Sequence, residues 1–475
     1  MLRKQNWLAS AFAIGILSVP VCAQQSSDQQ RITELERKID ELDRRLRAAE
    51  KAADGKAAAE TRVDPGPTAV SAAPVPAAVP NTVEAADLKS AASVSADQSG
   101  FTIKSGDGNY LLKIGADLQV DVRTFRGAGS GALTDQILLR RVRPTFSGTV
   151  YKYVDYYFRP DFGQGTTVIY DAYVQLNYIP RFQIRAGKFK PPVGLERLQS
   201  DDDTSFIERG LPTLLVPSRD IGFQISGDLV KRRVSYQAGV FNGVPDNSLS
   251  DTSASGHRTY AGRLFATPFQ TGGESPLSGL GFGIGALGGS VDNVALPAYK
   301  TAGQNTFFSF NSGVISAGHK TSLAPQAYYY LGPFGLLTEY TLTEEGFQKG
   351  SVRHDVAFRA WQAEASYILT GEKKGFTSPT PRKPFAPFNH GWGAWELAVR
   401  VGNFHVEQGL FNYGFADPTK SPNQAHEWLG GVNWYLNRLV RLSLDYGNTN
   451  FGGGAVNADR AAERVILARF QINFI

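Results

Sequence analysis

Apolar and polar residues alternate along many short segments between residues 112 and 474. In 112–123, for example, Leu112, Ile114 and Leu118 share one phase, whereas Lys113 and Asp117 occupy the other. Side chains on a β-strand point alternately to opposite faces, so a period of two predicts strands rather than helices. The pattern predicts sixteen strands, at 112–123, 142–150, 154–162, 172–176, 182–185, 220–228, 233–241, 258–269, 280–291, 320–331, 334–343, 355–369, 394–406, 427–436, 440–449 and 464–474.

The polar phase of these strands carries arginines and aspartates, and the apolar phase carries many aromatic residues. A packed core would not accept unpaired charges, and a soluble β-sandwich with one wet face is the alternative. Apolar side chains outside, polar side chains inside and short turns at one end are typical of outer-membrane barrels. We therefore predict an all-β chain with a transmembrane antiparallel β-barrel of about 16 strands, enough to enclose a water-filled channel.

One link conflicts with a simple up-and-down arrangement of these strands. Counting along the chain places the connector 371–393 at the barrel end where turns are short. Its length and its prolines are instead typical of an external loop. The conflict suggests that the pattern hides a strand boundary between residues 291 and 320.

The first 23 residues have the pattern of a secretory signal peptide. Arg3 and Lys4 give a positive start, residues 7–19 are apolar, and the small residue Ala23 ends the segment. The apolar run is too short for a spanning helix. Lipidation at Cys22 is disfavoured, because the preceding residue is not small. Removal of the signal leaves a mature chain without disulfides or cysteine metal sites.

A coiled-coil helix is predicted for residues 24–56, and a flexible linker for 57–98. The helix would carry an apolar seam at spacings of three and four residues, formed by Ile32, Leu35, Ile39, Leu42 and Leu46. Such a seam implies a partner helix, and a lone helix lying on the barrel is the alternative. Residues 57–98 are rich in Ala, Pro, Val and Ser. The linker would place the coiled coil in the periplasm, and residues 99–475 would form the barrel domain.

Composition and charge add a preference for anions. The chain of 475 residues has a mean hydropathy of −0.23. It contains no internal run of eighteen apolar residues, so the sequence predicts no spanning helix. The net charge is +5. Rings of inward Arg or Lys side chains select anions in pores. The polar phase of the predicted strands contains Arg141, Arg143, Arg159, Arg185, Arg400, Arg441 and Arg469.

Three motifs in the first half of the chain, 139–143 (LRRVR), 187–196 (GKFKPPVGLE) and 206–212 (FIERGLP), resemble the phosphate-selective porins O and P. The resemblance extends from about residue 110 to 475. It implies a trimeric outer-membrane porin whose long third loop, 191–218, folds inward and narrows the channel. The resemblance assigns the lysine of this constriction to Lys190 and its aspartate to Asp161 or Asp171.

These observations define a candidate anion path. Arg141 and Arg143 are expected to face lumen water about 7 Å apart along their strand, where planar guanidinium groups match phosphate oxygens. The acidic triplet 201–203 would repel an anion unless it binds the barrel wall or a cation. In the alternative interpretation, lumen arginines only fill the pore by pairing with Asp155, Asp161, Asp171, Glu396 and Asp445. The candidate residues are Arg141, Arg143, Arg159, Arg185, Lys190, Arg197, Arg209, Arg219, Arg400 and Asp161.

The predicted function is a passive, anion-preferring diffusion channel of the bacterial outer membrane for phosphate or polyphosphate. No catalytic or nucleotide-binding motif has its strand–helix context, and the six histidines lack metal-ligand spacing. We therefore predict no enzyme, cofactor or nucleic-acid partner. The expected partners are inorganic anions, outer-membrane lipid, further copies of the chain in a homotrimer, and peptidoglycan or another periplasmic contact through 24–56.

Two alternatives stay open. One is a nonspecific or sugar porin, in which Tyr157 and Tyr173 would form an aromatic surface in the lumen. The other is an envelope tether that uses the coiled coil, with the barrel as its anchor.

Overall fold

The computed structural model describes residues Arg37 and Arg44 and the ranges 91–97, 100–127, 133–270, 275–453 and 460–474. The chain divides into two compact units, Met1–Thr82 and Val83–Ile475. In the first unit Arg37 and Arg44 are helical. The predicted signal peptide, most of the predicted coiled coil and residues 57–90 of the linker lie outside the described residues.

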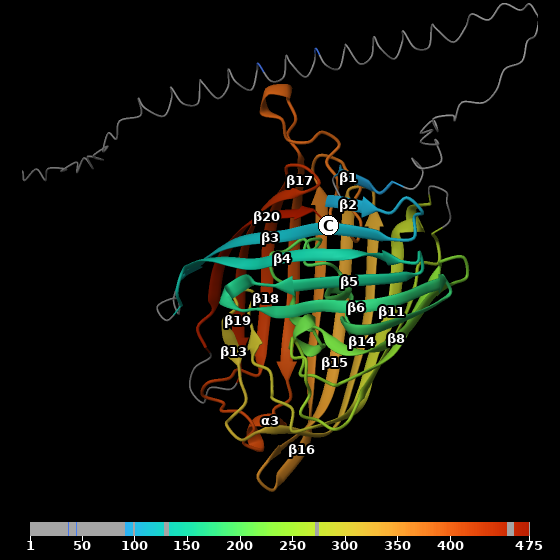
Figure 1. Cartoon of the computed structure of the whole chain (residues 1–475). Helices are drawn as coiled ribbons and strands as arrows, with labels where there is room; N and C mark the ends of the chain where they lie inside the picture. The colour runs from blue at the N-terminus through green and yellow to red at the C-terminus, as the bar shows by residue number, and fades with distance from the viewer. Residues whose placement is uncertain are drawn as a thin grey trace, which may run out of the picture. The chain divides into compact units, whose positions relative to one another are not determined.

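The second unit is a closed antiparallel barrel of sixteen strands, as the alternation predicts. Closure follows from strand β3, which pairs with β4 on one side and with β20 on the other. The wall consists of β3 (Leu111–Arg126), β4 (Gln136–Val150), β5 (Val154–Asp161), β6 (Val168–Ile179), β7 (Phe182–Phe189), β8 (Asp220–Leu229), β9 (Val234–Phe241), β10 (Thr259–Ala266), β11 (Leu280–Asp292), β14 (Ile315–Leu331), β15 (Phe334–Lys349), β16 (Val352–Ile368), β17 (Ala394–Val406), β18 (Gln424–Tyr435), β19 (Val440–Gly452) and β20 (Glu463–Phe474). Figure 1 shows β3–β6 in blue-green, crossing in front of the orange strands.

A hairpin of β1 (Ser93–Asp97) and β2 (Gly100–Lys104) extends the sheet beyond the start of β3. Residues 93–97 fall within the stretch expected to be linker. They form a strand because Phe101 and Ile103 pair with Ile114 and Leu112 of β3, which gives β1 an edge to join.

The alternating phases lie as an inside-out barrel requires. On β17 the outward residues Leu397, Val399 and Val401 are exposed, whereas the inward residues Glu396 and Arg400 are fully buried. An apolar outer surface and a charged interior are the reverse of a soluble sandwich core. Within the described ranges, no helix is long and apolar enough to cross a membrane.

The connector between β16 and β17 lies at the end of the short turns, so simple strand counting is correct and the suspected strand boundary is wrong. Residues 293–314 add only β12 (Tyr299–Lys300) and β13 (Thr306–Phe308), which pair with each other outside the barrel sheet. The connector is long because it enters the barrel. The ammonium of Lys374 binds Ser205 and Glu396 there, and Ser378 binds Asp203.

Long loops at the other end also fill the barrel. In the structure the third loop comprises residues 190–219, between the end of β7 and the start of β8, one residue longer at each end than expected. It contains the short helix α2 (Leu195–Leu198) and the 3-10 turn η5 (Leu211–Leu215). Helix α3 (Gly409–Asn412) lies in the loop before β18, and the 3-10 turn η4 (Gly163–Gly165) lies in the loop after β5. Two other 3-10 turns, η6 (Pro276–Gly279) and η7 (Pro387–Asn389), lie in connectors at the short-turn end. A buried apolar cluster joins the loops to the wall and includes Leu215, Phe307, Phe308, Phe358, Phe404 and Phe415.

Candidate anion path in the barrel lumen

The third loop is held across the lumen by its acidic side chains. Glu196 lies 3.7 Å from Arg400 of β17, and Oδ2 of Asp445 on β19 accepts a hydrogen bond of 2.8 Å from the backbone N–H of Ile207. Both contacts are buried. Because buried charged hydrogen bonds are among the stronger interactions in proteins, these contacts fix the loop inside the barrel.

Glu208 of the third loop contacts three arginines of the barrel wall. Its carboxylate lies 2.7 Å from Arg140 Nε and 3.3 Å from Arg123, with Arg469 at 3.8 Å. Burial alone would raise the pKa of the Glu208 carboxyl, but the neighbouring Arg140 guanidinium outweighs burial and lowers that pKa. This anchor of the loop is therefore charged throughout the physiological pH range.

Two members of the acidic triplet of the third loop bind the barrel wall, and the third, Asp203, binds Ser378 of the connector. Asp201 lies 2.5 Å from Arg143 and 3.4 Å from Arg141, and Asp202 lies 3.4 Å from Arg159. Each of these three arginines points inward, in the phase that the alternation predicts. Arg141 and Arg143 are only 5% and 3% exposed, so in this structure they are covered by the loop rather than open to lumen water.

The other candidate residues are also bound within the protein. Asp161 lies 2.7 Å from Arg143, and Arg219 lies 3.3 Å from Asp171, which are pairings of the pore-filling kind. Two further ion pairs join Arg400 to Glu427 at 3.1 Å and Arg209 to Asp201. Arg197 and Lys190 instead donate hydrogen bonds to backbone carbonyl oxygens, of Thr213 at 2.5 Å and of Gln199 at 2.7 Å.

Not every pairing in the pore-filling interpretation is found. Glu396 binds Lys374 at 2.6 Å rather than an arginine, and Asp155 accepts a hydrogen bond from Asn177. Asp445 accepts a hydrogen bond from the backbone of the third loop instead of pairing with an arginine. Pairing therefore depends on the inserted loops as much as on neighbouring strands.

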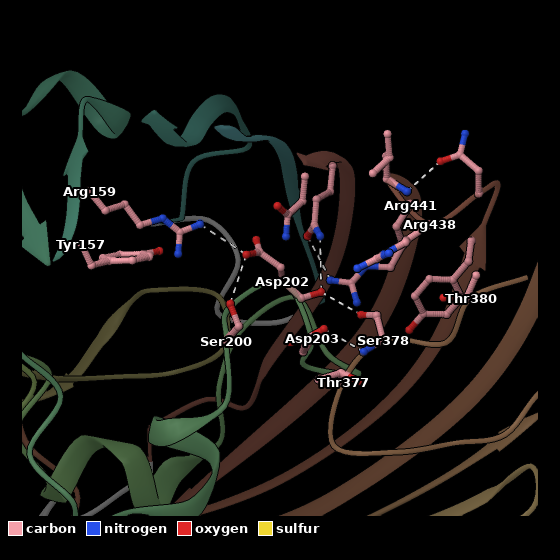
Figure 2. A pocket seen from close by; sticks show the side chains of 15 residues that line it. Tyr157, Arg159, Ser200, Asp202, Asp203, Thr377, Ser378, Thr380, Arg438 and Arg441 are labelled. Atoms are coloured by element: carbon pink, nitrogen blue, oxygen red, sulfur yellow. Dashed lines mark hydrogen bonds and ion pairs between the residues drawn. The ribbon is translucent and has the colours of Figure 1, made fainter. Parts of the chain in front are cut away.

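Two cavities remain open beside the third loop. The central cavity, of about 420 Å³, is lined by β5, β6, β7, β10 and the loop. The turn-side cavity, of about 400 Å³, reaches the short turn between β18 and β19. Tyr157, Arg159 and Ser200 line both cavities, so they mark the place where the two adjoin. Figure 2 shows the turn-side cavity, with Arg159 directed at Asp202, whose carboxylate also accepts a hydrogen bond from the Ser200 hydroxyl.

The walls of the central cavity carry more positive than negative side chains. Five are basic, and two are acidic, Asp171 and Asp201. Four of the basic residues were predicted from the sequence. The basic residues are Arg159, Arg185, Lys190, Arg219 and Arg263.

Two arginines of the central cavity have no acidic partner at ion-pair distance within the described part of the chain. Arg185 donates from Nε to Gln175 at 2.8 Å, and Arg263 donates from Nε to Gln326 at 2.9 Å. Both are partly exposed. These bonds orient each guanidinium and leave its terminal nitrogens available to an anion in the cavity.

Sequence reasoning missed Arg263, and it also missed Arg438 in the wall of the turn-side cavity. The alternation of side chains along β10 could have shown that Arg263 faces the lumen. Tyr260 and Leu264 are exposed on the lipid side of β10, which places Arg263 in the inward phase. Arg438 lies in a turn, where no phase applies. No cluster of three metal-ligating side chains occurs among the described residues.

A closed sixteen-stranded barrel with an apolar exterior, a charged lumen and an inserted third loop defines an outer-membrane porin. Residues 112–474 match the sequence family described as phosphate-selective porin O and P, and the chain belongs to this family.

Among curated proteins, the chain is similar to porin O of Pseudomonas aeruginosa, with 23% identity over 377 residues. The match covers 73% of this chain and 84% of that protein. Among solved structures, it is similar to the outer membrane channel DcaP of Acinetobacter baumannii, with a TM-score of 0.52 and 10% identity. That match covers 78% of this chain and 99% of the channel, and it supports the fold alone.

Proposed function

We propose that the protein is a passive, anion-preferring diffusion channel for phosphate or polyphosphate. The observation that carries the proposal is the pair Arg185 and Arg263, which line the central cavity and have no carboxylate at ion-pair distance among the described residues. Uncompensated inward cations attract anions and repel cations in a narrow pore. Passive diffusion requires neither a catalytic residue nor a cofactor.

The arrangement supports weak binding at several places rather than tight binding at one. An anion in the central cavity would meet Arg185 and Arg263, and then Arg159 where the two cavities adjoin. Conduction requires sites that are favourable enough to enter and weak enough to leave. Asp171 and Asp201 in the same wall moderate the positive potential, and therefore favour exit.

Two observations support phosphate as the transported anion: the geometry of the guanidinium group and the family to which the chain belongs. A guanidinium fork donates two parallel hydrogen bonds to phosphate oxygens, which a chloride ion cannot match. The family to which the chain belongs is described as phosphate-selective. The paired arginines Arg141 and Arg143 hold the third loop in this proposal, and they enter the anion path only when the loop moves.

A homotrimer is supported by the uneven height of the barrel wall. Strands β5, β7, β9 and β10 have 8 residues each, whereas β14 and β16 have 17. Eight residues extend about 27 Å, and the usual tilt reduces this to about 20 Å, which is below the ~25 Å apolar band of such barrels. A neighbouring copy against the low wall would shield it from lipid.

Tyr157 and Tyr173 favour a second candidate, a sugar or nonspecific porin. Their rings lie in the lumen and are stacked at 5.4 Å and 9°. A neutral sugar would use the rings without the arginines, so it would pass equally well when the arginines are replaced. A third candidate is an envelope tether formed by residues 24–56, for which we propose a periplasmic coiled coil.

Ion selectivity of the purified channel tests the proposal. In a planar bilayer with a potassium chloride gradient, the reversal potential should show chloride to be more permeant than potassium. Added phosphate should reduce the chloride current, because both anions compete for the same guanidinium groups. A cation-selective reversal potential would refute the proposal.

A further inference from the structure

Aromatic rings line the lumen beside the two arginines that have no acidic partner. Tyr157 and Tyr173 present partly exposed, parallel rings to the central cavity, and Phe376 of the connector lines the same cavity. Aromatic rings that line a cavity offer contacts to planar organic molecules. A small inorganic anion gains little from such contacts.

Each of the two arginines lies over one of these rings or over a neighbour in the wall. The guanidinium carbon of Arg185 is 4.3 Å from the ring centroid of Tyr173, and that of Arg263 is 4.2 Å from the centroid of Phe265. The contacts hold both guanidinium groups close to an aromatic ring of the wall. An anionic group bound to either arginine would therefore lie next to an aromatic ring.

The aromatic lining continues toward the short-turn end. Phe265 lies 5.2 Å from Tyr328, which lies 5.7 Å from Phe376 and 4.8 Å from Tyr330. Three of these rings, Tyr328, Tyr330 and Phe376, line a further cavity of about 500 Å³ together with Lys373 and Lys374, and Phe376 also lines the central cavity. Aromatic and basic side chains thus accompany each other from one cavity to the next.

We infer that the central cavity recognises planar aromatic anions, that is, an aromatic ring bearing a carboxylate or phosphate group. The inference rests on the proposed anion channel and specifies a substrate class for it. The anionic group binds Arg185 or Arg263, and the ring packs against the stacked pair of Tyr157 and Tyr173. The volume of about 420 Å³ lies within the range of cavities that hold small organic ligands.

The charge of the cavity favours this class over a neutral sugar. Aromatic walls alone would suit sugars, but here guanidinium groups lie against the rings and leave their terminal nitrogens free for an acid. A compact anion such as inorganic phosphate would bind the arginines and leave the rings unused. Only a molecule with both features engages both elements of the wall.

Block of the chloride current tests the inference with a matched pair of anions. Benzoate and cyclohexanecarboxylate have the same charge and similar size, and only benzoate is planar and aromatic. In bilayers with the full-length protein, benzoate should halve the chloride current at a concentration roughly threefold to tenfold below that of cyclohexanecarboxylate, since one aromatic contact supplies a difference of this order. Tyr173→Leu should bring the two concentrations together, whereas the exposed Tyr178→Leu on the same strand should preserve the difference.

The outcomes separate this inference from the proposed function. A channel that is anion-selective yet equally sensitive to the two carboxylates would overturn the inference and leave the channel proposal intact. Stronger block by a neutral sugar than by benzoate would also overturn it. A cation-selective reversal potential would overturn the proposed function itself. Heat-modifiable gel mobility of Tyr173→Leu establishes that the variant has folded, and Arg185→Gln provides a second loss of benzoate block.

Discussion

The Nη1 atom of Arg143 lies 2.5 Å from a carboxylate oxygen of Asp201, and this buried ion pair joins barrel strand β4 to the third loop. The same aspartate also faces Arg141 and Arg209. One carboxylate therefore holds three guanidinium groups away from the pore. The charge available to a passing anion is set by such pairings more than by the number of inward arginines.

Replacing Arg143 should destabilise the protein, since removal of one partner leaves the other charge buried and unpaired. Arg143→Gln should lower the free energy of unfolding by about 3–5 kcal/mol. The temperature at which the folded gel band is lost should fall accordingly. The control is Arg126→Gln, because Arg126 and Asp135 form an exposed pair worth at most ~1 kcal/mol. Equal melting of the two variants would show that the pair does not anchor the loop.

Asp201→Asn should raise anion preference. The substitution removes a negative charge from the central cavity and leaves Arg141 and Arg209 less compensated. Rings of uncompensated arginine favour anions. The reversal potential in a salt gradient should shift toward chloride, while Asp417→Asn, in the loop before β18, should not shift it. A shift toward potassium would contradict the assignment of Asp201.

The outward phase of β17 should reject charge. Val399 is 59% exposed near the middle of the strand, where it faces lipid. Val399→Arg should destabilise the barrel by about 2–4 kcal/mol and reduce assembly in membranes, whereas Val399→Leu should assemble normally. Quantitative heat-modifiable mobility of membrane fractions measures this. Normal assembly of the arginine variant would mean that this face does not contact lipid.

The connector should loosen when its buried lysine is removed. Lys374 lies 2.6 Å from Glu396 inside the barrel, whereas the adjacent Lys373 is exposed. Lys374→Met leaves a buried carboxylate unpaired, so we expect lower thermal stability and a larger single-channel conductance as the connector withdraws. Lys373→Met provides the matched control. Unchanged conductance and stability in Lys374→Met would rule out a role of the connector in closing the lumen.

Deletion of residues 24–90 distinguishes a channel from a tether. The deletion keeps the β1–β2 hairpin, which pairs with β3. Under the channel proposal the truncated protein retains its conductance and selectivity in bilayers. If the protein is a tether, the truncated protein should lose its attachment to the envelope. Attachment is measured as the fraction of protein that sediments with purified peptidoglycan. Loss of conductance after the deletion would contradict the channel proposal.

Alternation along the chain predicts all sixteen barrel strands, because the direction of a strand side chain depends only on its place in a local pattern. It cannot predict that Asp201 meets Arg143, since that contact depends on how a thirty-residue loop folds through the lumen. The same limit explains the connector, whose length is used inside the barrel by Lys374 and Ser378. Arg263 differs, because its phase was readable from Tyr260 and Leu264.

In the proposed channel, Arg185 and Arg263 supply the positive charge that selects anions. A unit charge acts with about 1 kcal/mol at 4 Å even in water, so loss of both should change selectivity severalfold. The control is Arg258→Gln with Arg359→Gln, which removes the same charge from exposed positions.

The most direct test is the reversal potential of the double variant Arg185→Gln with Arg263→Gln in a potassium chloride gradient. We expect the ratio of chloride to potassium permeability to fall at least about threefold relative to the control pair, with normal folding on gels. An unchanged ratio in a folded double variant would contradict the claim.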